Sequence, residues 1–378
     1  MDIGEILQMA TQWGASAVHL AVPARPVLRL YNELITAGEE SLTPTLMTEV
    51  FESITTEKQR ECFYQELELD FAYSIPGLSR FRVNASMQRG SIALVFRCLP
   101  NKIPTIDELG LPDICKRLIL KRKGLILVTG STSSGKSTTQ AAMIDHLNEN
   151  ENKKVVTIED PIEYMYSNKK CFIVQRDLGD DTLSFADAMR HALRQNADVI
   201  LVGEMRDVAT TAAAINAAET GHLVLATVHT QGAANVIDRI ISEFPPAQHE
   251  QIRVQLALTL EAVLSQILVP RIDCKGRVAV FEIMLANYAI RNLIRERKVY
   301  QVASIIETSS QYGMQTVDQG LEIAVRNGLI GVEDALLRAQ APEQMEKNLA
   351  SYVGRRQCKS GTAVRNTEAK LCPSNVRT

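Results

Sequence analysis

Near the middle of the chain runs the stretch Gly130-Ser131-Thr132-Ser133-Ser134-Gly135-Lys136-Ser137, which has the spacing G-x-x-x-x-G-K-S of a phosphate-binding loop. An apolar run over 125–128 comes before it, and a segment with a helical pattern follows it from Thr138. Such a loop needs this order of strand, loop and helix, because the helix start adds its positive dipole end to the backbone N–H groups of the loop. The stretch therefore predicts a nucleotide site. A Gly/Ser-rich connector that happens to carry a lysine is the structural alternative.

The residue types in this loop match the chemistry of ATP. Two glycines let backbone N–H groups turn inward around an anion, Lys136 can reach the β and γ phosphates, and the Ser137 hydroxyl can ligate Mg²⁺. We therefore predict ATP and Mg²⁺ as cofactors. The predicted nucleotide-binding residues are Ser131, Thr132, Ser133, Ser134, Gly135, Lys136, Ser137 and Thr138.

The composition is that of a soluble globular protein. A length of 378 residues suffices for two or three domains, and 46% hydrophobic and 22% charged residues are ordinary values. The formal net charge of −3 gives no electrostatic reason to expect binding to nucleic acid. Seven cysteines without a C-x-x-C pair argue against a disulfide framework or a zinc knuckle. The apolar runs have strand length and the start lacks a signal-peptide pattern, so we expect a cytoplasmic protein.

Residues 1–98 have the pattern of a small α+β domain. The predicted elements are an amphipathic helix near the start, a strand at 17–20, helices within 43–63, a hairpin of 69–74 and 79–84, and a strand at 91–97. The hairpin is predicted because apolar and polar residues alternate on both sides of Pro76-Gly77. The proline-rich stretch 99–112 is the predicted linker.

Residues 113–345 are predicted to form an α/β domain. The predicted strands, 125–129, 154–158, 199–202 and 223–227, are short, apolar and separated by helical segments. This alternation indicates a largely parallel sheet with both faces covered. The pattern over 231–341 is mostly helical. Residues 346–378 are predicted to be a disordered basic tail, because the stretch from Gly354 onward has six basic residues against one acidic and few large apolar ones.

Carboxylates follow two of the predicted strands, at the edge of the sheet where ligands gather. Glu204 follows the strand 199–202 and can polarise the attacking water or hold a metal-bound water. The acidic box Glu159-Asp160-Pro161-Ile162-Glu163 follows the strand 154–158, and its three carboxylates suit Mg²⁺ and water ligation. The predicted catalytic carboxylates are Glu204 and Glu163, and the predicted metal ligands are Ser137, Glu159 and Glu204. The plainer interpretations are a solvated loop glutamate and helix-starting caps.

Histidines and arginines extend the predicted site. His229 lies just beyond the strand 223–227 and is predicted to approach the γ-phosphate, whereas His222 is predicted to be structural or at a subunit contact. Arg82 and Arg97 lie on neighbouring predicted strands of the first domain, where both are available to reach a nucleotide held by an adjacent chain. On the residues alone, the two arginines are equally well explained as surface groups.

Taken together, these motifs resemble the secretion ATPase superfamily and, within it, the type IV pilus retraction ATPases of the PilT and PilU type. The resemblance covers about residues 1–345. It rests on the loop 130–137, the acidic box, the stretches 193–207, 220–230 and 313–319, and Ala289-Ile290-Arg291-Asn292-Leu293-Ile294-Arg295-Glu296. The last of these is similar to a C-terminal helix motif of retraction rather than assembly motors. From spacing alone, Ile290, Leu293 and Ile294 would be only an apolar helix face.

The resemblance implies a PAS-like first domain, a RecA-like ATPase domain with C-terminal helices, and a homohexamer with nucleotide between the two domains. Arg82 and Arg97 fall on the arginine positions of the family, and Arg176, Arg190 and Arg194 fit basic positions around the site. It also implies that the hexamer hydrolyses ATP to power pilus retraction and twitching motility. The implied location is the cytoplasmic face of the inner membrane, with a platform protein and a second retraction ATPase as partners and no nucleic acid.

The chain departs from the family within the loop. Ser131-Thr132-Ser133 stands where the family commonly has Pro-Thr-Gly, and the missing glycine is expected to limit a positive φ at residue 133 and to slow turnover. This altered loop keeps open an ATP-binding accessory ring that scarcely hydrolyses ATP. The RecA-like core leaves a nucleic-acid translocase as another alternative, and an assembly or secretion motor of the same superfamily is the nearest alternative enzyme.

Overall fold

The computed structural model describes residues 2–30, 33–38, 40–99, 102–273 and 276–359. The chain forms two compact units, Met1–Ile103 together with Pro161–Tyr166, and Pro104–Asp160 together with Ser167–Thr378. The division between Ile103 and Pro104 falls inside the stretch predicted as a linker. The acidic box is itself divided, because its last three residues group with the first unit.

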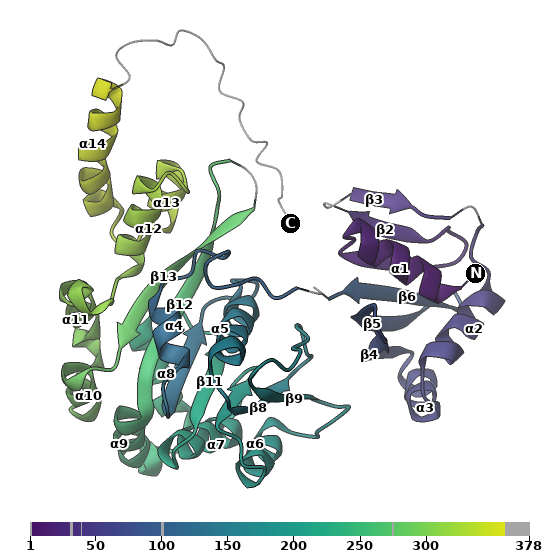
Figure 1. Cartoon of the computed structure of the whole chain (residues 1–378), viewed down its shortest axis with the longest axis horizontal. Coiled ribbons are helices and arrows are strands. Elements are labelled where there is room, and N and C mark those ends of the chain that lie inside the picture. The colour runs from purple at the N-terminus through teal and green to yellow at the C-terminus, as the bar shows by residue number, and fades with distance from the viewer. Residues whose placement is uncertain (1, 31–32, 39, 100–101, 274–275, 360–378) are drawn as a thin grey trace. The chain divides into compact units, whose positions relative to one another are not determined.

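The first unit is an antiparallel sheet with three helices (Figure 1). Its elements are α1 (Ile3–Trp13), β1 (Ala17–Leu20), β2 (Val27–Leu30), β3 (Glu33–Thr36), α2 (Pro44–Ile54), α3 (Glu57–Glu66), β4 (Glu68–Ile75), β5 (Ser79–Gln88) and β6 (Ser91–Cys98). The strand order is β3-β2-β1-β6-β5-β4. Sequence alternation explains the fold, since Phe81, Val83 and Ala85 of β5 and Ile92, Leu94 and Phe96 of β6 are buried in one core with residues of the helices. The predicted small α+β domain is confirmed.

The second unit contains a seven-stranded sheet. Its elements up to β11 are α4 (Ile114–Ile119), β7 (Gly124–Thr129), α5 (Lys136–Asn150), β8 (Lys154–Glu159), β9 (Phe172–Asp177), α6 (Phe185–Arg194), β10 (Val199–Val202), α7 (Val208–Glu219) and β11 (Leu223–Val228). The remaining elements are α8 (Ala233–Glu243), η1 (Pro246–Gln248), α9 (His249–Thr259), β12 (Leu260–Pro270), β13 (Arg277–Leu285), α10 (Tyr288–Arg295), η2 (Val299–Gln301), α11 (Val302–Thr308), η3 (Ser310–Tyr312), α12 (Val317–Arg326), α13 (Val332–Arg338) and α14 (Pro342–Lys359).

The sheet of this unit is parallel except at one edge. Its order is β13-β12-β7-β11-β10-β8-β9, and only the pair β12–β13 is antiparallel. All residues of β7, β10 and β11 are buried, as a sheet covered on both faces requires. Alternate residues of these strands pack against α6 to α9, and α5 packs on β7 with α4 beside it. The α/β fold class is confirmed.

One prediction about the C-terminal part was incomplete and one was wrong in part. The stretch 231–341 is mostly helical, as predicted, but it also contains the long strands β12 and β13, which were not predicted. Most of β12 is buried, so its apolar run lacks the alternation that would mark a strand and cannot be told from a buried helix. The tail predicted as disordered from residue 346 begins with helix, because α14 extends to Lys359. Leu349, within the predicted tail, is buried with α12 and α13, as is Met345 just before it. The rest of the predicted tail, 360–378, lies outside the described residues.

Within the described ranges, no helix has the length and apolar character needed to cross a membrane.

Candidate nucleotide site

The phosphate-binding loop, residues 130–137, connects β7 to α5. Gly130 has φ 142°, and a Cβ atom there would lie 2.3 Å from the main-chain oxygen of Gln266. Gly135 has φ 88°, and a Cβ atom there would lie 2.9 Å from Nε2 of the same glutamine. Both glycines are therefore required, by backbone conformation and by close packing.

Ser133 adopts the conformation that its side chain was expected to limit. Its φ is 62°, in the left-handed region that favours glycine. Ser133 lies on the exposed crown of the loop with Ser131 and Thr132. The loop thus keeps a left-handed turn at residue 133 without glycine, and the serine bears the conformational cost.

Lys136 is buried beneath the loop. It is only 7% exposed, and Nζ donates to the main-chain oxygens of Gly130 at 3.0 Å and Ser131 at 2.8 Å. Its Nζ also lies 3.4 Å from Nδ1 of His229. A buried ammonium inside the loop curve puts a positive charge where the phosphate-binding motif requires one.

A line of polar contacts leads from Lys136 to Glu204. Nε2 of His229 lies 3.1 Å from Oε1 of Glu204, and Nε of Arg206 donates to Oε2 of Glu204 at 2.6 Å. Because a lysine ammonium can only donate, Nδ1 of His229 accepts, which assigns the ring proton to Nε2 and directs it at the carboxylate. Arg206 also reaches Asp160 at 3.2 Å, and its hydrogen bond to Glu204 raises the pKa of the guanidinium. The residues that follow β8, β10 and β11, namely Asp160, Glu204 and His229, thus form one line of contacts that ends at the loop lysine.

The acidic box contributes less to this cluster than expected. The Glu159 carboxylate accepts from Thr157 of its own strand at 2.7 Å and from Gln175 of the neighbouring β9 at 3.4 Å, so side chains of these two strands hold it. Glu163 belongs to the first compact unit. In the part of the chain that the structure describes, no three His, Cys, Asp or Glu side chains gather as a metal site.

Arg82 and Arg97 face each other directly across β5 and β6 of the first unit. Side chains opposite one another on paired strands lie on the same face, and like charges there destabilise a sheet. Among the described residues, neither guanidinium has a hydrogen bond or ion pair. The pair therefore forms an uncompensated positive patch suited to an anion.

The other predicted basic residues are placed differently. Arg176 donates to the main-chain oxygen of Asp181 at 2.7 Å, and Arg190 forms an ion pair with Asp187 at 2.7 Å. Arg194 is exposed in the last turn of α6. Two of the three are therefore held by nearby groups of their own segment. His222 contacts the main-chain oxygen of Ala217 at 3.1 Å, which agrees with a structural role.

The loop residues fit a bound phosphate chain. Ser134 is 3% exposed, and among the described residues its Oγ has no hydrogen-bond partner. A buried hydroxyl without a partner carries a free-energy cost that a ligand oxygen would remove. Ser137, the second residue of α5, is half-buried where the loop meets the helix. These groups, with buried Lys136, suit an anion, and one hydroxyl at that point suits a cation bound with it.

Sequence reasoning missed Gln266, on β12. Its side chain is 2% exposed, and Oε1 accepts from the Thr139 hydroxyl at 2.8 Å, while its main chain and amide lie against Gly130 and Gly135. A polar residue between the apolar runs of β12 is the signal that would have pointed to it. Because β12 was not predicted as a strand, nothing in the sequence placed Gln266 beside the loop.

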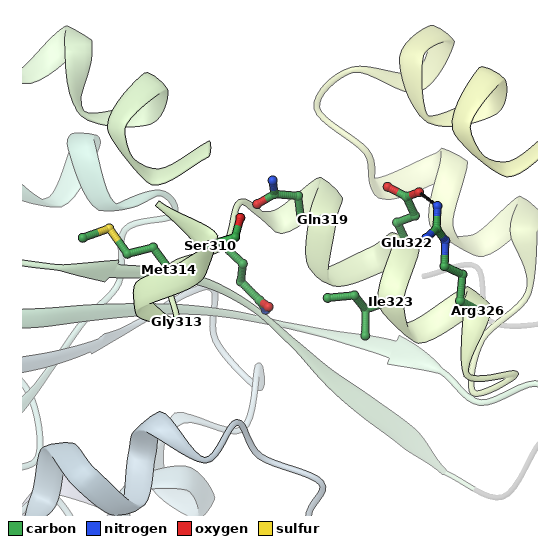
Figure 2. Close-up of a pocket in the computed structure, with 8 residues that line it drawn as sticks. Ser310, Gly313, Met314, Gln319, Glu322, Ile323 and Arg326 are labelled. Carbon is green, nitrogen blue, oxygen red and sulfur yellow. Dashed lines mark hydrogen bonds and ion pairs between the residues drawn. The ribbon is translucent and has the colours of Figure 1, made fainter. Parts of the chain in front are cut away.

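A separate cavity of about 300 Å³ lies along α12 (Figure 2). Met314 and Ile323 are among the residues that line it, and Glu322 and Arg326 form an ion pair in its wall. None of the predicted site residues lines this cavity, so it is not the nucleotide site.

The buried parallel strand, the loop with its lysine and the glutamate at the neighbouring strand end define the class of P-loop nucleotide-binding proteins. Comparison with known proteins identifies the family within this class. Residues 78–337 match the family described as Type II/IV secretion system protein. The chain therefore belongs to the type II/IV secretion system protein family.

Individual relatives extend over nearly the whole chain. The "Type IV pilus retractation ATPase PilT" of Pseudomonas aeruginosa is 45% identical over 91% of this chain and 99% of its own length. The type IV pilus ATPase PilU of the same organism is 38% identical over 91% of this chain and 90% of its own length. A crystal structure of the pilus retraction motor PilT with bound ADP has a TM-score of 0.85 at 43% identity, covering 92% of this chain and 99% of that one.

Proposed function

We propose that this chain is a motor ATPase that hydrolyses ATP to power type IV pilus retraction. The contact line from Lys136 through His229 to Glu204 carries the proposal, because it joins a phosphate-binding lysine to a carboxylate suited to the attacking water. Similarity to PilT over nearly the whole chain supports retraction as the task.

The residues of this chain divide the work of hydrolysis. Lys136 and the loop N–H groups hold the β and γ phosphates, and Ser134 offers its hydroxyl to a phosphate oxygen. Glu204 orients water for attack on the γ phosphorus, the bond to the bridging oxygen breaks, and ADP and phosphate leave. His229, with its ring proton on Nε2, orients the Glu204 carboxylate. Its Nδ1 contacts Lys136, which links it to the γ-phosphate.

Mg²⁺ would bind at the Ser137 hydroxyl, with Glu159 and Glu204 acting through water. The cation would neutralise charge on the phosphates when bound. Glu163 is proposed as a further catalytic carboxylate on the basis of the family resemblance.

A ring of identical chains supplies the remaining charge. Arg82 and Arg97, which lack acidic partners among the described residues, would reach a nucleotide held by an adjacent copy in a homohexamer. Such a finger makes hydrolysis depend on how neighbouring copies are placed, so each turnover can become a movement. The ring would act at the cytoplasmic face of the inner membrane, on a platform protein and alongside a second retraction ATPase.

ATP turnover by the purified full chain tests the proposal. We expect Glu204→Gln to keep nucleotide affinity and to lose about 100-fold or more of the hydrolysis rate, because the amide keeps the shape but accepts a proton poorly. Lys136→Ala should lose binding. Glu219→Gln is the matched control, because Glu219 is an exposed carboxylate at the end of α7. Undiminished turnover by the Glu204 variant would refute the role of Glu204. In a strain from which the gene is deleted, we expect this variant to fail to restore retraction.

An accessory ring that binds ATP but scarcely hydrolyses it is the second candidate. The strained Ser133 in the loop favours it, because that residue replaces the usual family glycine. Steady-state phosphate release by the unmodified chain separates the two candidates. Substantial release supports the motor, and tight binding without release supports the accessory ring.

A further inference from the structure

Arg291, in the retraction-type motif on α10, has contacts that the proposed hydrolysis does not use. Nη1 donates to the main-chain oxygens of Ala257 at 2.7 Å and Leu258 at 2.8 Å, near the carboxyl end of α9. Nε donates to the main-chain oxygen of Ala286 at 2.8 Å, and Nη2 donates to Oε1 of Glu261 at 2.7 Å. One guanidinium therefore joins the end of α9, the approach to α10 and the start of β12.

Glu261 occupies an irregular position in β12. The parallel pairing of β12 with β7 shifts between Leu260 and Ala262, so Glu261 is the extra residue of a bulge. Its side chain covers the first residue of β7, since a Cβ atom on Gly124 would lie 2.3 Å from Cγ of Glu261. Its second carboxylate oxygen accepts from Lys121 at 2.6 Å. Cations thus hold both oxygens of a carboxylate that is 19% exposed.

The bulge decides which residue of β12 meets the phosphate-binding loop. Beyond it the pairing runs without interruption to Ser265 opposite Thr129, the last residue of β7. Gln266 therefore lies beside Gly130, where its main chain and amide support both loop glycines. A register change of one residue would turn the Gln266 side chain to the opposite face of the sheet.

We propose that Arg291 is a positioning residue for the nucleotide loop, acting through the Glu261 bulge and Gln266. The guanidinium stabilises the bulge, the bulge sets the register of β12, and the register holds Gln266 beneath the loop. This inference rests on the proposed function, because it concerns the loop in its nucleotide-binding form. It gives the retraction-type motif a physical link to the nucleotide site.

Nucleotide affinity of the full chain, measured with ADP and with ATP, tests the inference. Arg291→Gln is expected to weaken binding roughly 3- to 30-fold, the usual range for coupling through packed networks. Arg291→Lys keeps a charge near Glu261 but cannot span the carbonyl groups, so its nucleotide affinity should lie between those of the wild type and Arg291→Gln. The matched control is Arg295→Gln in the same motif. Arg295 is exposed and donates to Asn292 on its own helix, so affinity should not change.

A double-variant comparison separates positioning from general destabilisation. Gln266→Leu removes the amide that supports the loop, and adding Arg291→Gln to it should weaken affinity little further, because both changes act through one link. Wild-type affinity in Arg291→Gln, or losses that add in the double variant, would overturn the inference alone. If Arg291→Gln unfolds, Arg291→Lys decides. A complete lack of nucleotide binding by the unmodified chain overturns both the inference and the proposed function.

Discussion

Gly130→Ala tests whether the phosphate-binding loop depends on both conformation and packing. A φ of 142° is essentially restricted to glycine, and forcing another residue there costs about 1–3 kcal/mol. The added Cβ would also lie 2.3 Å from the main-chain oxygen of Gln266, and overpacking of this kind costs about another 1–3 kcal/mol. We therefore expect a total of about 2–6 kcal/mol, shared between the free energy of unfolding and nucleotide affinity.

Gly221→Ala is the control for this prediction. Gly221 has φ 110°, but a Cβ atom there has nothing within 4 Å, so this variant carries the backbone strain without the clash. Urea unfolding and ADP titration of both variants supply the two free energies. If the whole cost of Gly130→Ala appears in binding, affinity falls at least about 30-fold, at about 1.4 kcal/mol per tenfold change. Summed changes equal to those of Gly221→Ala would refute the packing argument.

Two further predictions concern single side chains. Ser133→Gly should raise the free energy of unfolding by up to about 1.5 kcal/mol, because relief of a left-handed serine, about 1–2 kcal/mol, offsets the extra chain entropy that glycine loses, about 0.5–1 kcal/mol. Lowered stability in urea would contradict this. Burial raises the pKa of Glu282, whose carboxylate accepts from the Ala233 amide at 2.5 Å. Since the folded chain then holds this proton more tightly than the unfolded chain, stability falls as pH rises from the ordinary carboxyl range through the raised pKa. Glu282→Gln should therefore gain stability over the wild type across that window, and a difference independent of pH would count against the assignment.

Local sequence predicted much of the fold because local rules govern those parts. The strand-loop-helix order around residue 130, the hairpin around Pro76-Gly77 and the apolar parallel strands each follow from spacing, turn residues or burial on both faces. The strands β12 and β13 did not follow, because an antiparallel edge added to a parallel sheet depends on partners far away in the chain. Residues from 346 onward, predicted as disordered, likewise begin as helix, because Leu349 is buried against α12 and α13, which precede it in the chain.

The sequence by itself determined the chemistry of this protein, because a phosphate-binding loop is read from residues adjacent in the chain. Tertiary structure alone decided which groups surround that loop. Parallel strand ends brought Glu204 and His229 to Lys136, and a bulge at Glu261 set Gln266 beneath the glycines. The physical reason is that register and sheet order arise from contacts between distant segments, which no local pattern encodes.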